Sequence, residues 1–133
     1  MAGRRKSGAL PRPTDAELVI LRVLWQRGDS TVRDVHDALR AQGIGYTTVL
    51  KQLQIMTEKG LVDRNENQRA HVYTPRASEE RTQRQLLRDL VDRAFGGSPA
   101  RLVLQALAGQ RSTPQQLREI RALLDALEKE EGK

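Results

Sequence analysis

The chain has 133 residues and a net charge of +6, with 23 Lys or Arg residues against 17 Asp or Glu residues. It has no cysteine, which excludes disulfide bonds and thiolate metal sites, and no apolar run long enough to cross a bilayer. No apolar stretch follows the basic first residues as a secretion signal would require, so a soluble cytoplasmic protein is expected. Residues 1–77 hold 13 basic residues against 8 acidic ones, and residues 78–133 hold 10 against 9, so the first part is expected to meet a polyanion.

Residues 1–13, MAGRRKSGALPRP, combine small residues with two prolines and four basic residues. This composition cannot build a packed core, so it predicts a disordered basic tail. Such a tail either touches DNA phosphates or simply keeps the chain in solution.

The first helix is predicted to begin at Thr14, which forms a capping box with Glu17. Gly28 is expected to end it. The apolar stripe of this helix contains Leu18, Leu21, Leu24 and Trp25. Because Trp25 shares that stripe, it is interpreted as a core anchor and not as a platform for stacking bases.

A second helix is predicted from Thr31, whose hydroxyl can cap it, to residues 42–43. Its apolar positions are Val32, Val35 and Leu39. Two short helices and a tight glycine-containing turn before a third helix are typical of a helix-turn-helix.

The third helix is predicted to begin at Thr47 or Thr48 and to end at Gly60. Its apolar stripe consists of Val49, Leu53 and Met56. The opposite face carries Thr47, Lys51, Gln54 and Glu58, with Thr48, Gln52 and Lys59 on its flanks. These side chains can bond base edges and phosphates on an element that fits a major groove.

After Gly60 the pattern becomes alternating, and residues 61–64 and 71–74 are predicted to form a hairpin with a polar tip. Arg69 lies beside that tip, and Arg64 lies at the base of the tip. A groove-binding helix followed by a basic hairpin is the second half of a winged helix, in which the hairpin rests on the DNA backbone. The alternative is an amphipathic helix and hairpin on the surface with no ligand.

Three more helices are predicted beyond a boundary at residues 77–78, with starts at Ser78, Ser98 and Thr113. The last one carries a two-heptad apolar seam. These helices can bury little by themselves, so their apolar faces are expected to meet a second copy of the chain; the alternative is that they pack back on the N-terminal part. The predicted dimerisation residues are Leu86, Leu90, Phe95, Leu117, Ile120, Leu124 and Leu127.

No phosphate-binding glycine loop and no catalytic triad can be recognised, so an enzyme is not expected, and no cofactor is implied. The two histidines are His36 and His71. His36 stands between Asp34 and Asp37, but neighbours on a helix do not converge on one ion, so a solvated helix face is favoured over a metal site.

Four segments of the chain are similar to the penicillinase-repressor (BlaI/MecI/CopY) family of transcriptional regulators. They are PTDAELVILRVLW, TVRDVHDAL, GYTTVLKQLQIMTEKGLV and RAHVYTP. The later LVLQAL and STPQQLREIRALLDAL also resemble the dimerisation half of that family. The resemblance extends over nearly all of residues 13–127.

The resemblance implies a homodimeric repressor that covers a promoter, often one of antibiotic-resistance or stress genes. It implies DNA contacts at Tyr46, Thr47, Thr48, Lys51, Arg69 and His71. Two neighbours on the third helix, Gln52 and Ile55, complete the predicted DNA-binding set, with Ile55 expected to touch a thymine methyl group or a sugar.

Three positions depart from the family pattern. Ile55 stands where relatives commonly carry Arg, and Gln105-Ala106 replaces the Asn-Phe pair at which the beta-lactam branch is cleaved after a membrane metalloprotease sensor is triggered. The copper branch carries a C-terminal cysteine motif, which this chain lacks. A sensor partner therefore stays an open expectation.

We therefore predict a mainly α fold with a small β-hairpin wing: an N-terminal winged helix-turn-helix followed by a C-terminal three-helix dimerisation arm. The expected domains are a tail at 1–13, a DNA-binding domain at 14–77 and a dimerisation domain at 78–133. The predicted function is repression at a pseudo-palindromic operator. The alternative is a winged helix that serves only as a protein–protein interaction module.

Overall fold

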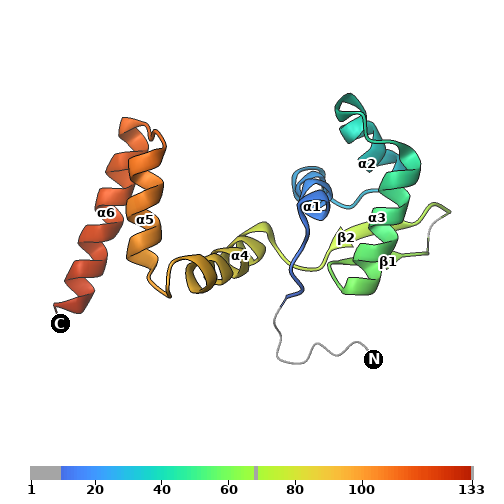
Figure 1. Cartoon of the computed structure of the whole chain (residues 1–133). Helices are drawn as coiled ribbons and strands as arrows, with labels where there is room; N and C mark the ends of the chain where they lie inside the picture. The colour runs from blue at the N-terminus through green and yellow to red at the C-terminus, as the bar shows by residue number, and fades with distance from the viewer. Residues whose placement is uncertain (1–9, 68, 133) are drawn as a thin grey trace. The chain divides into compact units, whose positions relative to one another are not determined.

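The structure is a computed structural model, and it describes residues 10–67 and 69–132. Its elements in chain order are α1 (Asp15–Arg27), α2 (Val32–Leu39), the short 3-10 helix η1 (Arg40–Gln42), α3 (Tyr46–Lys59), β1 (Val62–Asn65), β2 (Val72–Pro75), α4 (Glu79–Ala94), α5 (Pro99–Gly109) and α6 (Pro114–Glu131). They form two compact units, Met1–Asp89 and Leu90–Lys133 (Figure 1). The fold is mainly helical with one antiparallel hairpin, which confirms the predicted fold class.

The helices of the first unit begin where local capping predicts. The Thr14 hydroxyl accepts a hydrogen bond from the backbone N–H of Glu17, and the Glu17 carboxylate accepts one from the backbone N–H of Thr14. Thr31 forms the same reciprocal box with Asp34 at the start of α2. These bonds satisfy amides that the first turn of a helix leaves without partners.

The start of α3 differs from the prediction. The helix begins at Tyr46 with Gly45 as its N-cap, and neither Thr47 nor Thr48 caps it. Gly43, whose φ is +78°, makes the tight turn that lets the helix start early. Gly60 ends the helix in the left-handed conformation, as predicted.

One apolar core joins α1, α2, α3 and the hairpin. Its fully buried side chains include Leu21, Leu24, Val35, Val49, Leu53, Met56, Val62 and Tyr73. Each such side chain contributes roughly 1.5–3 kcal/mol on leaving water. The core therefore presses the inner face of α3 against α1 and α2 and leaves its outer face to solvent.

The hairpin is shifted by one residue from its predicted position, because Leu61 and His71 lie outside the strands. Val62 pairs with Pro75 and Asn65 with Val72. Ser30, in the loop between α1 and α2, also exchanges backbone bonds with Tyr73, at N–O distances of 2.7 and 3.1 Å. This bridge ties the wing to the helices.

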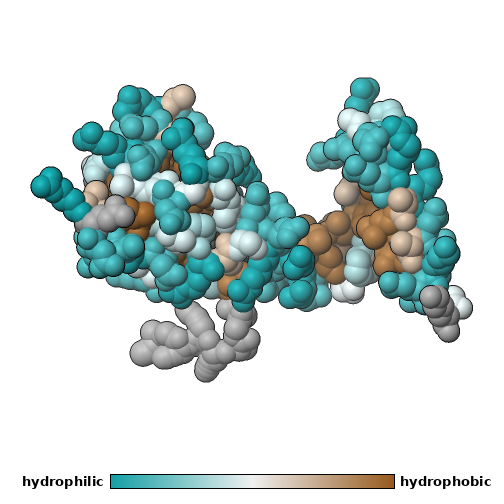
Figure 2. All heavy atoms as spheres, turned by 180° about the vertical axis from the view of Figure 1, so that it is seen from behind, coloured by the Kyte–Doolittle hydropathy of each residue, from teal (hydrophilic) through white to brown (hydrophobic). Residues whose placement is uncertain are grey.

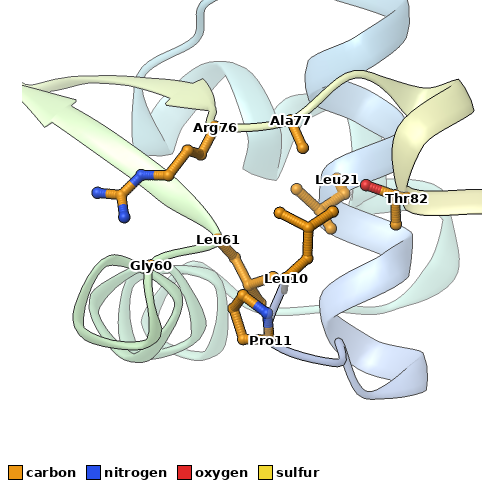
Figure 3. Close-up of a pocket in the computed structure, with 8 residues that line it drawn as sticks. All are labelled: Leu10, Pro11, Leu21, Gly60, Leu61, Arg76, Ala77 and Thr82. Carbon is orange, nitrogen blue, oxygen red and sulfur yellow. The ribbon is translucent and has the colours of Figure 1, made fainter. Parts of the chain in front are cut away.

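Residues 10–13 lie on the first unit, whereas residues 1–9 of the predicted tail fall outside the described residues. Leu10 and Pro11 close a cavity of about 10 Å³ against Leu21, Leu61 and Thr82 (Figure 3). Arg12 pairs with Asp89 of α4 at 3.5 Å. The start of α4 thus belongs to the first compact unit, which extends past the predicted boundary at residues 77–78.

Trp25 holds the connection between the wing and α4. Its indole Nε1 donates to the carbonyl oxygen of Ala77 at 3.0 Å. Trp25 is partly buried and packs against the core, as its position in the apolar stripe of α1 predicts.

We expect Trp25→Phe to lower the free energy of unfolding by about 1–2 kcal/mol, because it leaves the Ala77 carbonyl without its donor. Thermal unfolding followed by circular dichroism measures the change. Tyr46→Phe, at an exposed aromatic residue of the same unit, serves as the control and should leave stability unchanged. Equal stability of Trp25→Phe and the wild type would show that this bond contributes nothing.

Candidate nucleic-acid interface

The outer face of α3 projects its polar side chains into solvent. Thr47, Lys51 and Gln54 are exposed, directly opposite the buried stripe of the same helix. The early start of α3 places Thr47 and Thr48 inside its first turn, where their hydroxyls do not serve as caps. The face therefore offers hydroxyl, amide and ammonium groups at once, which is the chemistry that base edges and phosphates accept.

A hollow of about 500 Å³ lies beside this face, between the first turns of α2 and α3 and the end of the wing loop. Its polar lining includes Arg33, Tyr46, Arg69 and His71. Among the described residues, none that lines the hollow carries a carboxylate. The structure thus brings together three predicted contact residues, Tyr46, Arg69 and His71, in surroundings that favour a negatively charged ligand.

Arg33 is a lining residue that was not predicted from the sequence. It is the second residue of α2, directly after the capped start of that helix, and it is exposed. Helix starts favour phosphate because their free amides and dipole attract negative charge. That signal was present in the sequence at Thr31, but it does not reveal which side of the helix faces the wing.

Tyr46 is held in place by a histidine. The rings of His36 and Tyr46 meet edge to face, with centroids 5.7 Å apart and planes at 80°. His36 is partly buried, whereas its neighbours Asp34 and Asp37 are exposed. Tyr46 lines the hollow and remains exposed, so its side chain can contact a ligand there.

The other arginines of the wing are engaged in ion pairs. Glu66 bonds to Arg64 and raises the pKa of that guanidinium, and Asp63 does the same for Arg76. The first pair lies near the tip of the wing and the second near the base of the wing, and each neutralises its arginine. Arg69 and His71, which are exposed, are the basic side chains at its free end.

The remaining predicted contacts lie toward α1. Thr48 and Gln52 line a separate hollow whose other walls come from α1, from α2 and from Ile44 and Val49. Ile55 is half-buried on the same flank. The predicted set is therefore divided between the two sides of α3, with Thr47 and Lys51 between them.

The predicted dimerisation residues are mostly open to solvent. Leu90, Leu117, Leu124 and Leu127 are 38–50% exposed, and Leu86, Phe95 and Ile120 are partly buried. Leu104, at 68%, and Leu123, at 57%, are further exposed leucines of α5 and α6 that the prediction omitted. Figure 2 shows apolar surface over these C-terminal helices.

Within the part of the chain that the structure describes, no group of three or more His, Cys, Asp or Glu residues could hold a metal ion. No helix of the described residues has the length and apolar character needed to span a membrane.

Comparison with protein families matches residues 13–126 to the model described as penicillinase repressor. The sequence is 43% identical over 68 residues to the transcriptional regulator BlaI of Mycobacterium tuberculosis, and the match covers 50% of this chain. The chain spans about half the length of that relative, 49%.

Two solved structures are also similar. One is the solution structure of the DNA-binding domain of the repressor BlaI, at 27% identity and a TM-score of 0.48, covering 53% of this chain and 87% of that one. The other is the monomeric form of Bacillus licheniformis BlaI in complex with the blaP half-operator, at 26% identity and a TM-score of 0.48, covering 53% and 88%.

Proposed function

The chain belongs to the penicillinase repressor family, and we propose from this premise that it represses transcription by binding double-stranded DNA through α3 and the wing. The family regulates transcription and is not a family of enzymes. We further propose that the protein acts in the cytoplasm, where the DNA lies.

The observation that carries the proposal is the exposed face of α3 beside the basic hollow. Thr47, Lys51 and Gln54 would enter the major groove, while Arg33 and Arg69 contact the phosphates on either side. Tyr46 and His71 complete that contact. The described residues that line the hollow include two arginines and no carboxylate, which supports a polyanion as the ligand.

We propose that Thr48, Gln52 and Ile55 meet the same groove from the α1 side of the helix. The Ile55 side chain can contact either a thymine methyl group or a sugar of the DNA. Because Gln52 and Ile55 are partly buried, whereas Lys51 is exposed, the contribution of this flank to affinity should be smaller than that of Lys51.

A homodimer is part of the proposal. The exposed leucines of α6 support it, because a single copy leaves them in water while a second copy can cover them. Two copies would present two α3 helices to half-sites about 34–36 Å apart on a pseudo-palindromic operator. Because the chain belongs to this family, we propose that the genes it controls are antibiotic-resistance or stress genes.

Proteolytic release through a membrane metalloprotease sensor has little support in this chain. Gln105 and Ala106 are exposed but lie inside α5, and proteolytic nicking favours exposed loops. We therefore leave this partner out of the proposal.

Salt dependence separates DNA binding from the alternative of a protein–protein module. Titration of duplex DNA at several salt concentrations should give a linear fall of log K with log salt, because each neutralised phosphate releases counterions. The slope of log K against log salt concentration is expected to be about −4 or steeper if phosphates are contacted by Lys51, Arg33 and Arg69 and by the wing of the second copy in the proposed dimer. A flat response would contradict the proposal.

Lys51→Ala should weaken operator binding about tenfold, which is roughly 1.4 kcal/mol, and leave folding unchanged. Its ammonium group stands exposed in the middle of the outer face of α3 and can reach a phosphate or a base edge. Band-shift titration at fixed salt measures the effect. Arg88→Ala, at an exposed site on α4, is the control, and equal affinities of both variants would contradict the assignment.

A further inference from the structure

Two hollows lie side by side where α1 meets the end of α2, because Val19 of α1 and Leu39 of α2 line both. The first has a volume of about 200 Å³, and its apolar walls are Ala16, Val19, Ile20, Leu39, Ile44 and Val49. The second has a volume of about 270 Å³ and is lined by Arg22, Arg27, Gln26 and Gln42 next to apolar residues. One end of this joint groove is thus apolar and the other is basic.

The two arginines at the basic end make no ion pair with any of the described residues. Both are exposed, and none of the described residues that line either hollow carries a carboxylate. Asp37 is already paired with Arg40. A carboxylate ligand would therefore meet two guanidinium groups without displacing an internal partner, and guanidinium is suited to holding carboxylate with paired hydrogen bonds.

The apolar end fits an aromatic ring. Dry apolar cavities of about 150 Å³ in proteins hold benzene, and this hollow is somewhat larger. Along α1, Arg22 and Gln26 lie three and seven residues beyond Val19, which corresponds to about 4.5 and 10.5 Å of helix. A short chain between ring and carboxylate spans that distance. The cavity of Figure 3, at about 10 Å³, has no such capacity.

We propose that this groove is a binding site for small aryl-alkyl monocarboxylates. The ring lies among Val19, Ile20 and Ile44, and the carboxylate lies between Arg22 and Arg27. Thr48 and Gln52 of α3 form part of the ring's enclosure, so an occupied groove also alters the α1 flank of the DNA-contacting helix. This last coupling to DNA rests on the proposed function, whereas the site itself does not.

Direct titration of the full-length protein without DNA tests the site. The probe is 4-phenylbutyrate, followed by calorimetry or by amide chemical shifts, and a Kd of about 1 mM or tighter is expected for a ligand of this size. The uncharged 4-phenylbutan-1-ol and the ringless butyrate should each bind at least about fivefold more weakly. Equal binding of the acid and the alcohol, or no binding of the acid, would overturn the proposal.

Two variants locate the ligand. Arg22→Ala with Arg27→Ala should lower affinity for the acid at least fivefold and leave affinity for the alcohol unchanged. Ala16→Phe, at an exposed position on the apolar rim, should weaken both. Arg88→Ala and Ala122→Phe are the matched controls at exposed helix positions elsewhere, and losses of the same size in these controls would overturn the assignment.

DNA titration in the presence of saturating 4-phenylbutyrate then tests the coupling. Operator affinity should fall about fivefold in the wild type and stay unchanged in the Arg22→Ala, Arg27→Ala variant. Ligand binding with no change in operator affinity would overturn the coupling and leave the site intact. Because the first titration contains no DNA, a failure of the proposed function cannot be mistaken for a failure of the site.

Discussion

Replacing Leu124 and Leu127 together with glutamate is expected to lower operator affinity by a factor of about 10²–10⁴. Both side chains are about half exposed on one face of α6, where a second copy would cover them in the proposed homodimer. Two carboxylates in that face would have to lose their water on association, so the variant should be monomeric. A monomer binds each half-site separately and loses the advantage of a linked second contact.

Sedimentation of the variant and operator titration at fixed salt measure the two effects. Ala122→Glu with Ala126→Glu is the matched control, since it adds the same charge to exposed positions of α6 away from the leucine face. The control should stay dimeric and bind normally. A leucine variant that remains dimeric, or a wild type that is already monomeric, would contradict the role of this face.

Lys59→Met is expected to lower the free energy of unfolding by about 2–4 kcal/mol. The Lys59 ammonium lies 2.6 Å from a carboxylate oxygen of Glu17, whose side chain is only 3% exposed. Removing one partner leaves a buried charge poorly compensated, at a cost of about 3–5 kcal/mol in a fully buried pair. The Lys59 side chain is 32% exposed, so water reaches the pair and a smaller loss is expected.

A double-mutant cycle separates this effect from a general disturbance of α3. Glu17→Gln removes the charge and keeps an oxygen that can accept from the Thr14 amide, so the double variant should be more stable than Lys59→Met alone. Lys51→Met, at an exposed lysine of the same helix, should change stability by less than about 0.5 kcal/mol. Calorimetry at one protein concentration measures the free energy of unfolding of each variant. Equal losses of stability in Lys59→Met and Lys51→Met would show that the ion pair of Lys59 with Glu17 does not stabilise the fold.

Local signals in the sequence were sufficient to predict the helices of the first unit. The capping boxes at Thr14 and Thr31 and the stop at Gly60 act within a few residues of themselves, so they can be recognised without knowledge of the fold. The start of α3 was predicted too late, because threonine is a common cap and Gly45 carries no side chain to signal one.

Features that depend on distant packing were not predicted. Three such features join segments that lie far apart in the chain. They are the bridge between Ser30 and Tyr73, the ion pair of Glu17 with Lys59, and the packing of Leu10 and Pro11 against Leu21 and Leu61. Glu17 was recognised only as half of a capping box, since nothing near it in the sequence points to Lys59.

The same limit applies to the candidate interface. Helical spacing identified the outer face of α3, but it could not show that α1 lies along the flank of Thr48 and Gln52 while the wing loop approaches Tyr46. Arg33 was missed for the same reason. The contacts of all these residues with DNA stay predictions.

The hydrogen bond from Trp25 to Ala77 gives the protein a built-in optical reporter. Trp25 is the one tryptophan in the chain, so its ultraviolet emission comes from a single place, the point where the segment after the wing passes over α1. When that segment leaves the indole, water reaches the ring and its emission moves to longer wavelength. The emission wavelength of Trp25 therefore reports whether the segment before α4 is packed on α1, and the measurement needs no attached dye.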